Sequence, residues 1–231
     1  MFLNINLFII GLCMGSFLNC LEYRYINHLP LLLDRSKCDK CSHVLNIFDL
    51  IPVVSWIRLK GKCRYCGNTI SIRYPLSELI CGIGYTLIFL KYSLSNYFFI
   101  YLILFSCLFY ISLVDFDIYE IPEWCLIVCL ISWIMLNIKI CNLMHLVYAV
   151  TIAGYVYLLS LVMKKILKKD CFGFGDIKLI FIIGLFLGLH KTIWCLLLAC
   201  IIGIFIILIN KKEMIPFGPA LSISCFILLT I

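Results

Sequence analysis

Long apolar runs, separated by short charged blocks, make up most of the chain. A helix that crosses a bilayer needs about 20 apolar residues, and somewhat shorter runs also suffice. The pattern therefore predicts eight membrane-spanning helices, at residues 3–21, 76–90, 97–114, 123–138, 143–163, 177–189, 192–210 and 215–231. We expect an all-α polytopic membrane protein. It divides into a first transmembrane helix (1–21), a polar loop (22–75) and a seven-helix membrane bundle (76–231).

The composition supports a membrane location. Hydrophobic residues make up 64% of the 231 positions and charged residues 13%, whereas soluble domains have about 45–50% apolar and about 25% charged residues. The first apolar run, residues 2–21, has no basic residue before it and no small-residue cleavage site. This pattern favours a retained helix over a cleaved signal peptide.

The basic residues predict the orientation, because Lys and Arg gather in cytoplasmic loops. They crowd three regions: the loop 22–75, the segment 164–178, and Lys211 with Lys212. With eight spans and the N-terminus outside, all three regions are cytoplasmic. The formal charge of +7 is then a feature of membrane orientation. We expect no nucleic acid partner, since no basic helix or aromatic-basic surface accompanies the charge.

Four of the fifteen cysteines form a metal-binding pattern. The two C-x-x-C pairs, with 21 residues between them, have the spacing of structural zinc sites, and consist of Cys38, Cys41, Cys63 and Cys66. A reducing cytoplasmic loop favours thiolate ligands over disulfides. The sequence predicts one structural Zn²⁺ held by four sulfurs. His43 is an alternative ligand, and four free cysteines are the simpler interpretation.

Two acidic motifs fall at one predicted membrane face. Asp115 ends the third span, and Asp176 follows Gly173 and Gly175 at the start of the sixth. Ionisable residues at membrane depth are costly and usually functional. Two facing aspartates share a proton, so one can activate water while the other protonates the substrate. The pattern predicts an aspartyl protease with Asp115 and Asp176 as its catalytic pair.

Other interpretations of the aspartates stay open. Asp176 at a helix N-terminus is favourable for capping alone. A proton-coupled transporter also uses such pairs, although paired half-chains are missing from the sequence. A non-enzymatic assembly scaffold is a third class.

The chain resembles the type IV prepilin peptidases, which are bifunctional leader peptidases and N-methyltransferases. Beyond the cysteine pairs and the two acidic motifs, the segments that carry the resemblance are Gly15–Asn19 with Arg24, Arg35-Ser36, Ile51-Pro52 to Ser55, Leu59–Gly67, Ile70–Pro75 with Glu78, and Ile215–Ala220. The resemblance implies that Asp115 and Asp176 are catalytic, with Asp117 as a neighbouring modulator or a solvated carboxylate. Glu123 stands where the family usually has aspartate, and Phe174 where it often has glycine.

The family resemblance also implies a reaction. The leader of a prepilin or pseudopilin precursor is cleaved after a glycine at the cytoplasmic face of the bacterial inner membrane, in contact with membrane lipid. The new N-terminus is then methylated with S-adenosylmethionine. The residues show no glycine-rich turn for that cofactor, so methylation rests on the resemblance, and a peptidase without methylation is the alternative.

A few polar and glycine positions outside the pair are further candidates. Asn19, Arg24, Arg73 and Glu78 are candidate functional residues outside the aspartate pair. Buried polar groups near a membrane must be paired, so the alternative role of Arg73 and Glu78 is to tie the loop to the helix bundle. Gly15 and Gly218 are expected to permit close helix packing.

Overall fold

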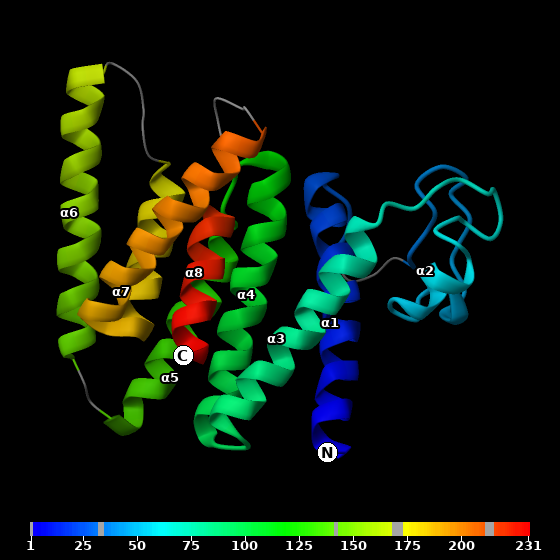
Figure 1. Cartoon of the computed structure of the whole chain (residues 1–231), viewed down its shortest axis with the longest axis horizontal. Coiled ribbons are helices and arrows are strands. Elements are labelled where there is room, and N and C mark those ends of the chain that lie inside the picture. Colours follow the sequence, from blue (N-terminus) through cyan, green and yellow to red (C-terminus); the bar gives the residue numbers. More distant parts are fainter. Residues whose placement is uncertain (1, 32–34, 141–142, 168–172, 211–214) are drawn as a thin grey trace. The chain divides into compact units, whose positions relative to one another are not determined.

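The structure of the protein is a computed structural model that describes residues 2–31, 35–140, 143–167, 173–210 and 215–231. Apart from two isolated β-bridges, the secondary structure of these residues is helical (Figure 1). The helices are α1 (Phe2–Ile26), η1 (Ile47–Asp49), α2 (Val54–Arg58), α3 (Arg73–Tyr92), α4 (Asn96–Ile118), α5 (Glu123–Ile140), α6 (Met144–Leu167), α7 (Phe174–Asn210) and α8 (Gly218–Thr230). The chain forms two compact units, residues 1–98 and 99–231.

Four helical segments among the described residues are long and apolar enough to cross a membrane: Leu3–Ile26, Tyr97–Ile118, Met144–Ile166 and Phe174–Leu208. The chain is therefore a membrane protein. Each predicted span falls on a helix, but α3, α5 and α8 do not meet the same standard of length and hydropathy. The count of eight crossings is thus not established by the helices themselves.

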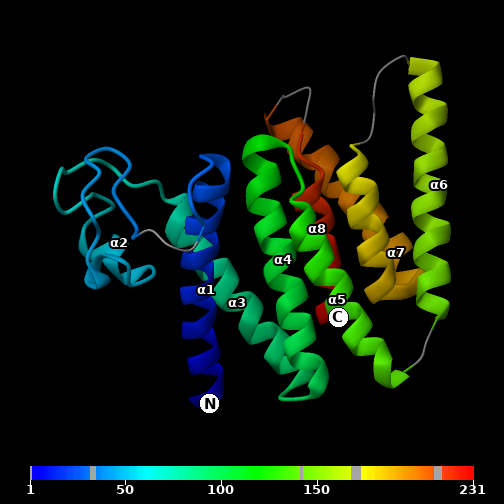
Figure 2. The same cartoon turned by 180° about the vertical axis from the view of Figure 1, so that it is seen from behind.

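Glycines bring α1 and α3 of the first unit into close contact, and both views show the two helices side by side (Figures 1 and 2). A Cβ atom on Gly11 would lie 2.7 Å from the Cα of Gly82, and one on Gly15 would lie 2.8 Å from the Cα of Glu78. No side chain fits at these distances. Small residues four apart on a helix allow such close packing between membrane helices, as expected for Gly15.

Polar side chains pair within the first unit near the end of α1 that leads into the loop. The Asn19 amide donates to the Ser77 hydroxyl over 2.7 Å, and both side chains are buried. Arg73 forms an ion pair with buried Glu22 at 2.8 Å.

Glu78 and Arg24, two other polar residues singled out in the sequence, form hydrogen bonds with the loop. The backbone N–H of Val53 donates to Glu78 Oε2 over 2.7 Å, and Arg24 donates to the carbonyl oxygen of Leu31 over 2.8 Å. Since Val53 lies in the loop and Glu78 on α3, this hydrogen bond ties the loop to the helix as the sequence predicted.

In the second unit, α7 packs against α5, α6 and α8. It is interrupted at Gly188, whose φ of 70° lies in the left-handed region that favours glycine. The carbonyl oxygen of Leu185, just before the interruption, accepts a hydrogen bond from Trp133 Nε1 over 2.8 Å and lies 3.0 Å from His145 Nδ1. Side chains of α5 and α6 therefore contact a backbone carbonyl of α7 at its interruption.

The interruption differs from the sequence prediction, which placed a connection at residues 190–191. The structure keeps these residues helical and changes the backbone direction at Gly188 instead. His190 and Lys191 are polar but have ordinary helical propensity, whereas the left-handed backbone requires a residue without a β-carbon. The polar residues His190 and Lys191 thus indicated the right region of the chain, but the steric requirement of the backbone places the interruption at Gly188.

Candidate functional site

Asp115 lies three residues before the end of α4 and is only 5% exposed. Its Oδ2 accepts a hydrogen bond from the backbone N–H of Gly218, the first residue of α8, over 2.8 Å. The first N–H groups of a helix have no partner within the helix and attract negative charge. The N-terminus of α8 therefore holds the Asp115 carboxyl in place.

Gly218 has no room for a side chain. A Cβ atom there would lie 2.7 Å from Asp115 Oδ2 and 3.1 Å from Asp115 Cγ. Sequence reasoning assigned this glycine to helix packing and missed its contact with Asp115. The available signal was its position: Pro-Phe-Gly-Pro directly precedes an apolar run, so the glycine N–H sits at a predicted helix start.

Asp176 lies in the first turn of α7. Its backbone N–H donates to the carbonyl oxygen of Gly173 over 3.1 Å, and its carboxyl accepts a hydrogen bond from the Gly173 backbone. Asp176 thus caps the helix, as in a capping box. It is also close enough to Asp115 for the two carboxyl groups to interact electrostatically. The fold brings the two predicted aspartates together from positions 61 residues apart.

The segments that carry the two aspartates contact each other at further points. A Cβ atom on Gly175 would lie 3.2 Å from the Cβ of Ile121. Lys178 Nζ forms an ion pair with Glu123 and lies 5.1 Å from the centre of the Phe174 ring. The start of α7 is therefore fixed against the turn between α4 and α5. The pairing of Glu123 with Lys178 was not foreseen from the sequence.

Asp117 has a different environment from Asp115. It lies two residues further along α4 and is exposed, whereas Asp115 is buried. On a helix, residues two apart point in different directions. Its role, as a modulator or as a solvated carboxylate, stays a prediction.

The two neighbouring carboxyl groups define the chemistry available to this site. Like charges at short range disfavour double ionisation, so such a pair retains one proton between two carboxyls. The protonated member can act as a general acid and the ionised member as a general base. This combination suits the hydrolysis of an amide bond by an activated water molecule.

The second candidate site is the cysteine loop (residues 35–72) of the first unit. Its two C-x-x-C pairs lie in turns of the same design: the N–H of Ser42 donates to the carbonyl of Cys38, and that of Gly67 to the carbonyl of Cys63, over 2.8 and 3.0 Å. Both Ser42 and Gly67 have a left-handed backbone. Each turn is closed by one of the two isolated bridges, Lys37–Val44 and Lys62–Thr69.

The four sulfurs fit a metal ion. They come from Cys38, Cys41, Cys63 and Cys66, and all lie within 4.8 Å of one another. Four sulfurs in a tetrahedron around Zn²⁺, each at about 2.3 Å, are separated by about 3.8 Å, and the sulfurs of Cys38 and Cys66 are 3.8 Å apart. Backbone N–H groups of Cys41 and Lys40 donate to Cys38 and lower the pKa of its thiol to about 7. Thiolate is the form that binds metals.

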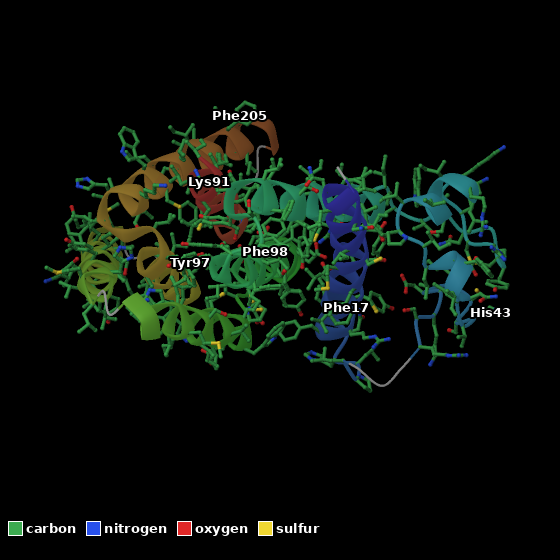
Figure 3. All side chains as sticks on the ribbon, turned by 90° about the horizontal axis from the view of Figure 1, so that it is seen from below. Phe17, His43, Lys91, Tyr97, Phe98 and Phe205 are labelled. Atoms are coloured by element: carbon green, nitrogen blue, oxygen red, sulfur yellow. The ribbon has the colours of Figure 1, made fainter. Side chains whose placement is uncertain are left out.

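His43, the alternative metal ligand, packs against an aromatic ring. Its ring lies 3.7 Å from the ring of Tyr65, measured between centroids. Figure 3 shows His43 in the cysteine loop, well separated from Phe17 on α1. The metal-binding group found among the described residues consists of the four cysteines without this histidine.

Comparison with known proteins identifies the family. The model of the bacterial peptidase A24 N-terminal domain matches residues 9–92, and the model of the type IV leader peptidase family matches residues 102–208. A prepilin leader peptidase/N-methyltransferase of Neisseria gonorrhoeae is 31% identical over 96% of this chain and 88% of its own length. The chain belongs to the type IV leader peptidase family.

Other relatives of the family cover the chain to a similar extent. The type 4 prepilin-like proteins leader peptide-processing enzyme of Escherichia coli O78:H11 is 30% identical over 93% of this chain and 88% of its own length. The prepilin leader peptidase/N-methyltransferase of Bacillus subtilis is 29% identical over 94% and 89%. No solved structure matches the chain.

The cluster of four cysteine sulfurs predicts that the purified protein contains a bound metal ion. Replacing one ligand, Cys38→Ser, should greatly reduce the metal content measured by plasma mass spectrometry, because an incomplete tetrahedral site binds weakly. Cys13→Ser, at an exposed cysteine of α1, is the matched control and should keep the metal. Equal metal content in both variants contradicts the site.

Proposed function

We propose that this chain cleaves the short leader peptide of prepilin or pseudopilin precursors after a glycine and methylates the new N-terminus. The observation that carries the proposal is the pairing of Asp115 with Asp176 in a chain that belongs to the type IV leader peptidase family. Its relatives are named leader peptidases and N-methyltransferases, which supports both halves of the proposed reaction.

In this proposal Asp115 and Asp176 are the catalytic pair. One carboxylate removes a proton from water, which attacks the carbonyl carbon of the scissile bond, and the other carboxyl protonates the leaving amine. The N–H of Gly218 fixes Asp115, and the capping contact with Gly173 fixes Asp176. The helix termini thus keep the two carboxyls in place before substrate arrives.

The proposal includes the membrane topology. Eight crossings with the N-terminus outside place the basic loops, the cysteine loop and both aspartates at the cytoplasmic face. The first helix, the loop 22–75 and the seven-helix bundle 76–231 are then the functional divisions. The length of α7 favours this count, because its largely apolar segment of 35 residues extends about 53 Å, whereas a bilayer core is about 30 Å thick. A backbone interruption at Gly188 suits two crossings.

The metal in the cysteine loop is proposed to be a structural Zn²⁺. Four sulfur ligands complete a tetrahedron and leave no position for water. Cys38, Cys41, Cys63 and Cys66 then hold the two turns of the loop together, and the aspartates carry out the hydrolysis without the metal.

Methylation requires a methyl donor, S-adenosylmethionine in the family. The described residues contain no parallel sheet with a glycine-rich turn, so they provide no dinucleotide-type fold for the cofactor, and its binding residues stay unassigned. Mass spectrometry of the mature substrate tests this half of the proposal. A product heavier by one methyl group is expected, and an unmodified N-terminal amine would leave a peptidase alone.

Loss of either paired aspartate should abolish leader removal. When the chain is expressed with a pilin-like precursor, Asp115→Asn and Asp176→Asn are expected to reduce cleavage by about 100-fold or more, since each removes an acid–base group. Asp117→Asn is the matched control and should still cleave because that carboxyl is exposed and lies outside the pair. Leader removal on a gel is the measurement. Cleavage by all three variants would favour the transporter or scaffold interpretations.

Gly218→Ala tests the support of Asp115 separately. The added methyl group collides with Asp115 Oδ2, and displacing a catalytic group by about 1 Å lowers the rate by about 100-fold. Gly203→Ala is the control, because the nearest atoms around its new Cβ belong to Phe217 at 3.9 Å. Equal cleavage rates for the two variants, at equal expression and thermal stability, contradict the positioning role of Gly218.

A further inference from the structure

We propose that the segment Ile47–Arg58 of the cysteine loop, which contains η1 and α2, inserts into the interfacial layer of the phospholipid bilayer and anchors the loop to the membrane. This anchor is independent of the proposed peptidase activity. It assigns a lipid-binding surface to a segment that neither the metal site nor the aspartate pair uses.

The segment exposes large apolar side chains. Ile47 is 79% exposed, Phe48 58%, Val54 57% and Ile57 64%. Val54 and Ile57 are three residues apart and therefore lie on one face of α2. A contiguous exposed apolar surface marks a partner or a membrane, and isolated surface hydrophobes do not explain four such residues in twelve positions.

The hydrogen bond between Val53 and Glu78 sets the depth of this surface. Val53 directly precedes α2, and its N–H donates to Glu78 Oε2 over 2.7 Å. The Cα of Glu78 lies 2.8 Å from the Cβ position of Gly15 on α1. Leu21 is the last residue of this apolar run before its charged end. Gly15 lies six residues earlier, which is about 9 Å along the helix. Interfacial elements bury their apolar face about 5–10 Å below the surface.

The first cysteine pair lies nearer the polar end of α1. The side chain of Asp39, between Cys38 and Cys41, hydrogen-bonds with Tyr23, which lies beyond Leu21. Figures 1 and 2 both draw α2 beside α1 rather than beyond its end. The cysteine loop is thus inclined relative to α1. Its first metal-binding turn lies near the polar end of α1, and α2 lies at the depth of the apolar residues of α1.

The charged groups of the segment have partners within the protein, which favours a location at the lipid interface. Its one acidic residue, Asp49, forms an ion pair with Arg64 at 2.8 Å, and its side chain is 3% exposed. Asp49 also accepts hydrogen bonds from the Asn46 backbone and the Tyr65 hydroxyl. Arg58 donates to the carbonyl oxygen of Phe48. Most of the exposed side chains of the segment are therefore apolar.

Basic residues follow the apolar surface directly. Arg58, Lys60 and Lys62 occur within five residues, and no acidic residue lies between them. Lys and Arg beside an inserted apolar surface bind the anionic headgroups of phospholipids. A bilayer that contains anionic phospholipid therefore matches both the depth and the charge of the segment.

Fluorescence quenching in the full chain tests the anchor. A genetically encoded fluorescent amino acid is placed at Ile57 or, as the matched control, at Lys40, which is exposed in the first cysteine pair. Each protein is reconstituted in vesicles of phosphatidylethanolamine and phosphatidylglycerol. The quenchers are iodide in the water and a nitroxide on the upper acyl chain of a lipid. Equal metal content of both proteins confirms that the loop is folded.

At position 57 we expect strong quenching by the nitroxide lipid and iodide quenching several-fold weaker than at position 40. Position 40 should show the reverse order. Both positions belong to one loop, so a mixture of vesicle orientations affects them equally. Iodide quenching at 57 equal to that at 40 overturns the proposal, because the segment is then in water. Protection of 57 from both quenchers also overturns it, because protein then covers the surface.

Discussion

A polar group at the depth of an apolar helix must find its partner inside the protein, and the architecture of both units follows from this requirement. The buried Asp115 carboxyl is met by the first N–H of α8, and the Leu185 carbonyl near the interruption of α7 is met by Trp133. In the first unit, Asn19 pairs with Ser77 and Glu22 with Arg73. Each pair joins segments distant in sequence, so these contacts fix which helices are neighbours.

Glycine permits the close approaches that accompany these contacts, because it has no β-carbon. At Gly218 the carboxylate occupies the place where a side chain would stand, and at Gly15 the backbone of α3 does. The interruption at Gly188 has a different cause, a backbone with φ 70° and ψ −176° that only glycine adopts readily and that costs other residues about 1–3 kcal/mol. The polar pairs and the small residues are therefore two aspects of one packing arrangement.

Much of this could be predicted from the sequence, because apolar length and ligand spacing are local signals. Each expected span lies on a helix, and Cys38, Cys41, Cys63 and Cys66 form one cluster. The position of the α7 interruption could not be predicted, since His190 and Lys191 gave a polar signal two residues beyond Gly188.

The contact between Gly218 and Asp115 was missed for a related reason. It joins residues 103 positions apart, and helix periodicity does not specify which helix start faces which carboxyl. The ion pair of Glu123 with Lys178 is equally non-local. Local sequence signals predicted the elements and the reactive groups, and the tertiary contacts determined how those groups are supported.

Glu78 and Asp115 show why a buried carboxyl alone does not indicate catalysis. Both are largely buried and both accept a backbone N–H at short range, from Val53 and Gly218 respectively. The Glu78 side chain also hydrogen-bonds with the hydroxyl of Ser16, whereas Asp115 interacts electrostatically with a second carboxyl, that of Asp176. A single carboxyl among neutral hydrogen-bond donors has no second carboxyl with which to share a proton, and its hydrogen bond with Val53 fixes the backbone around it. Only the pair must hold a proton that either member can transfer, and this is the physical difference between an anchor for the cysteine loop and a group suited to acid–base chemistry.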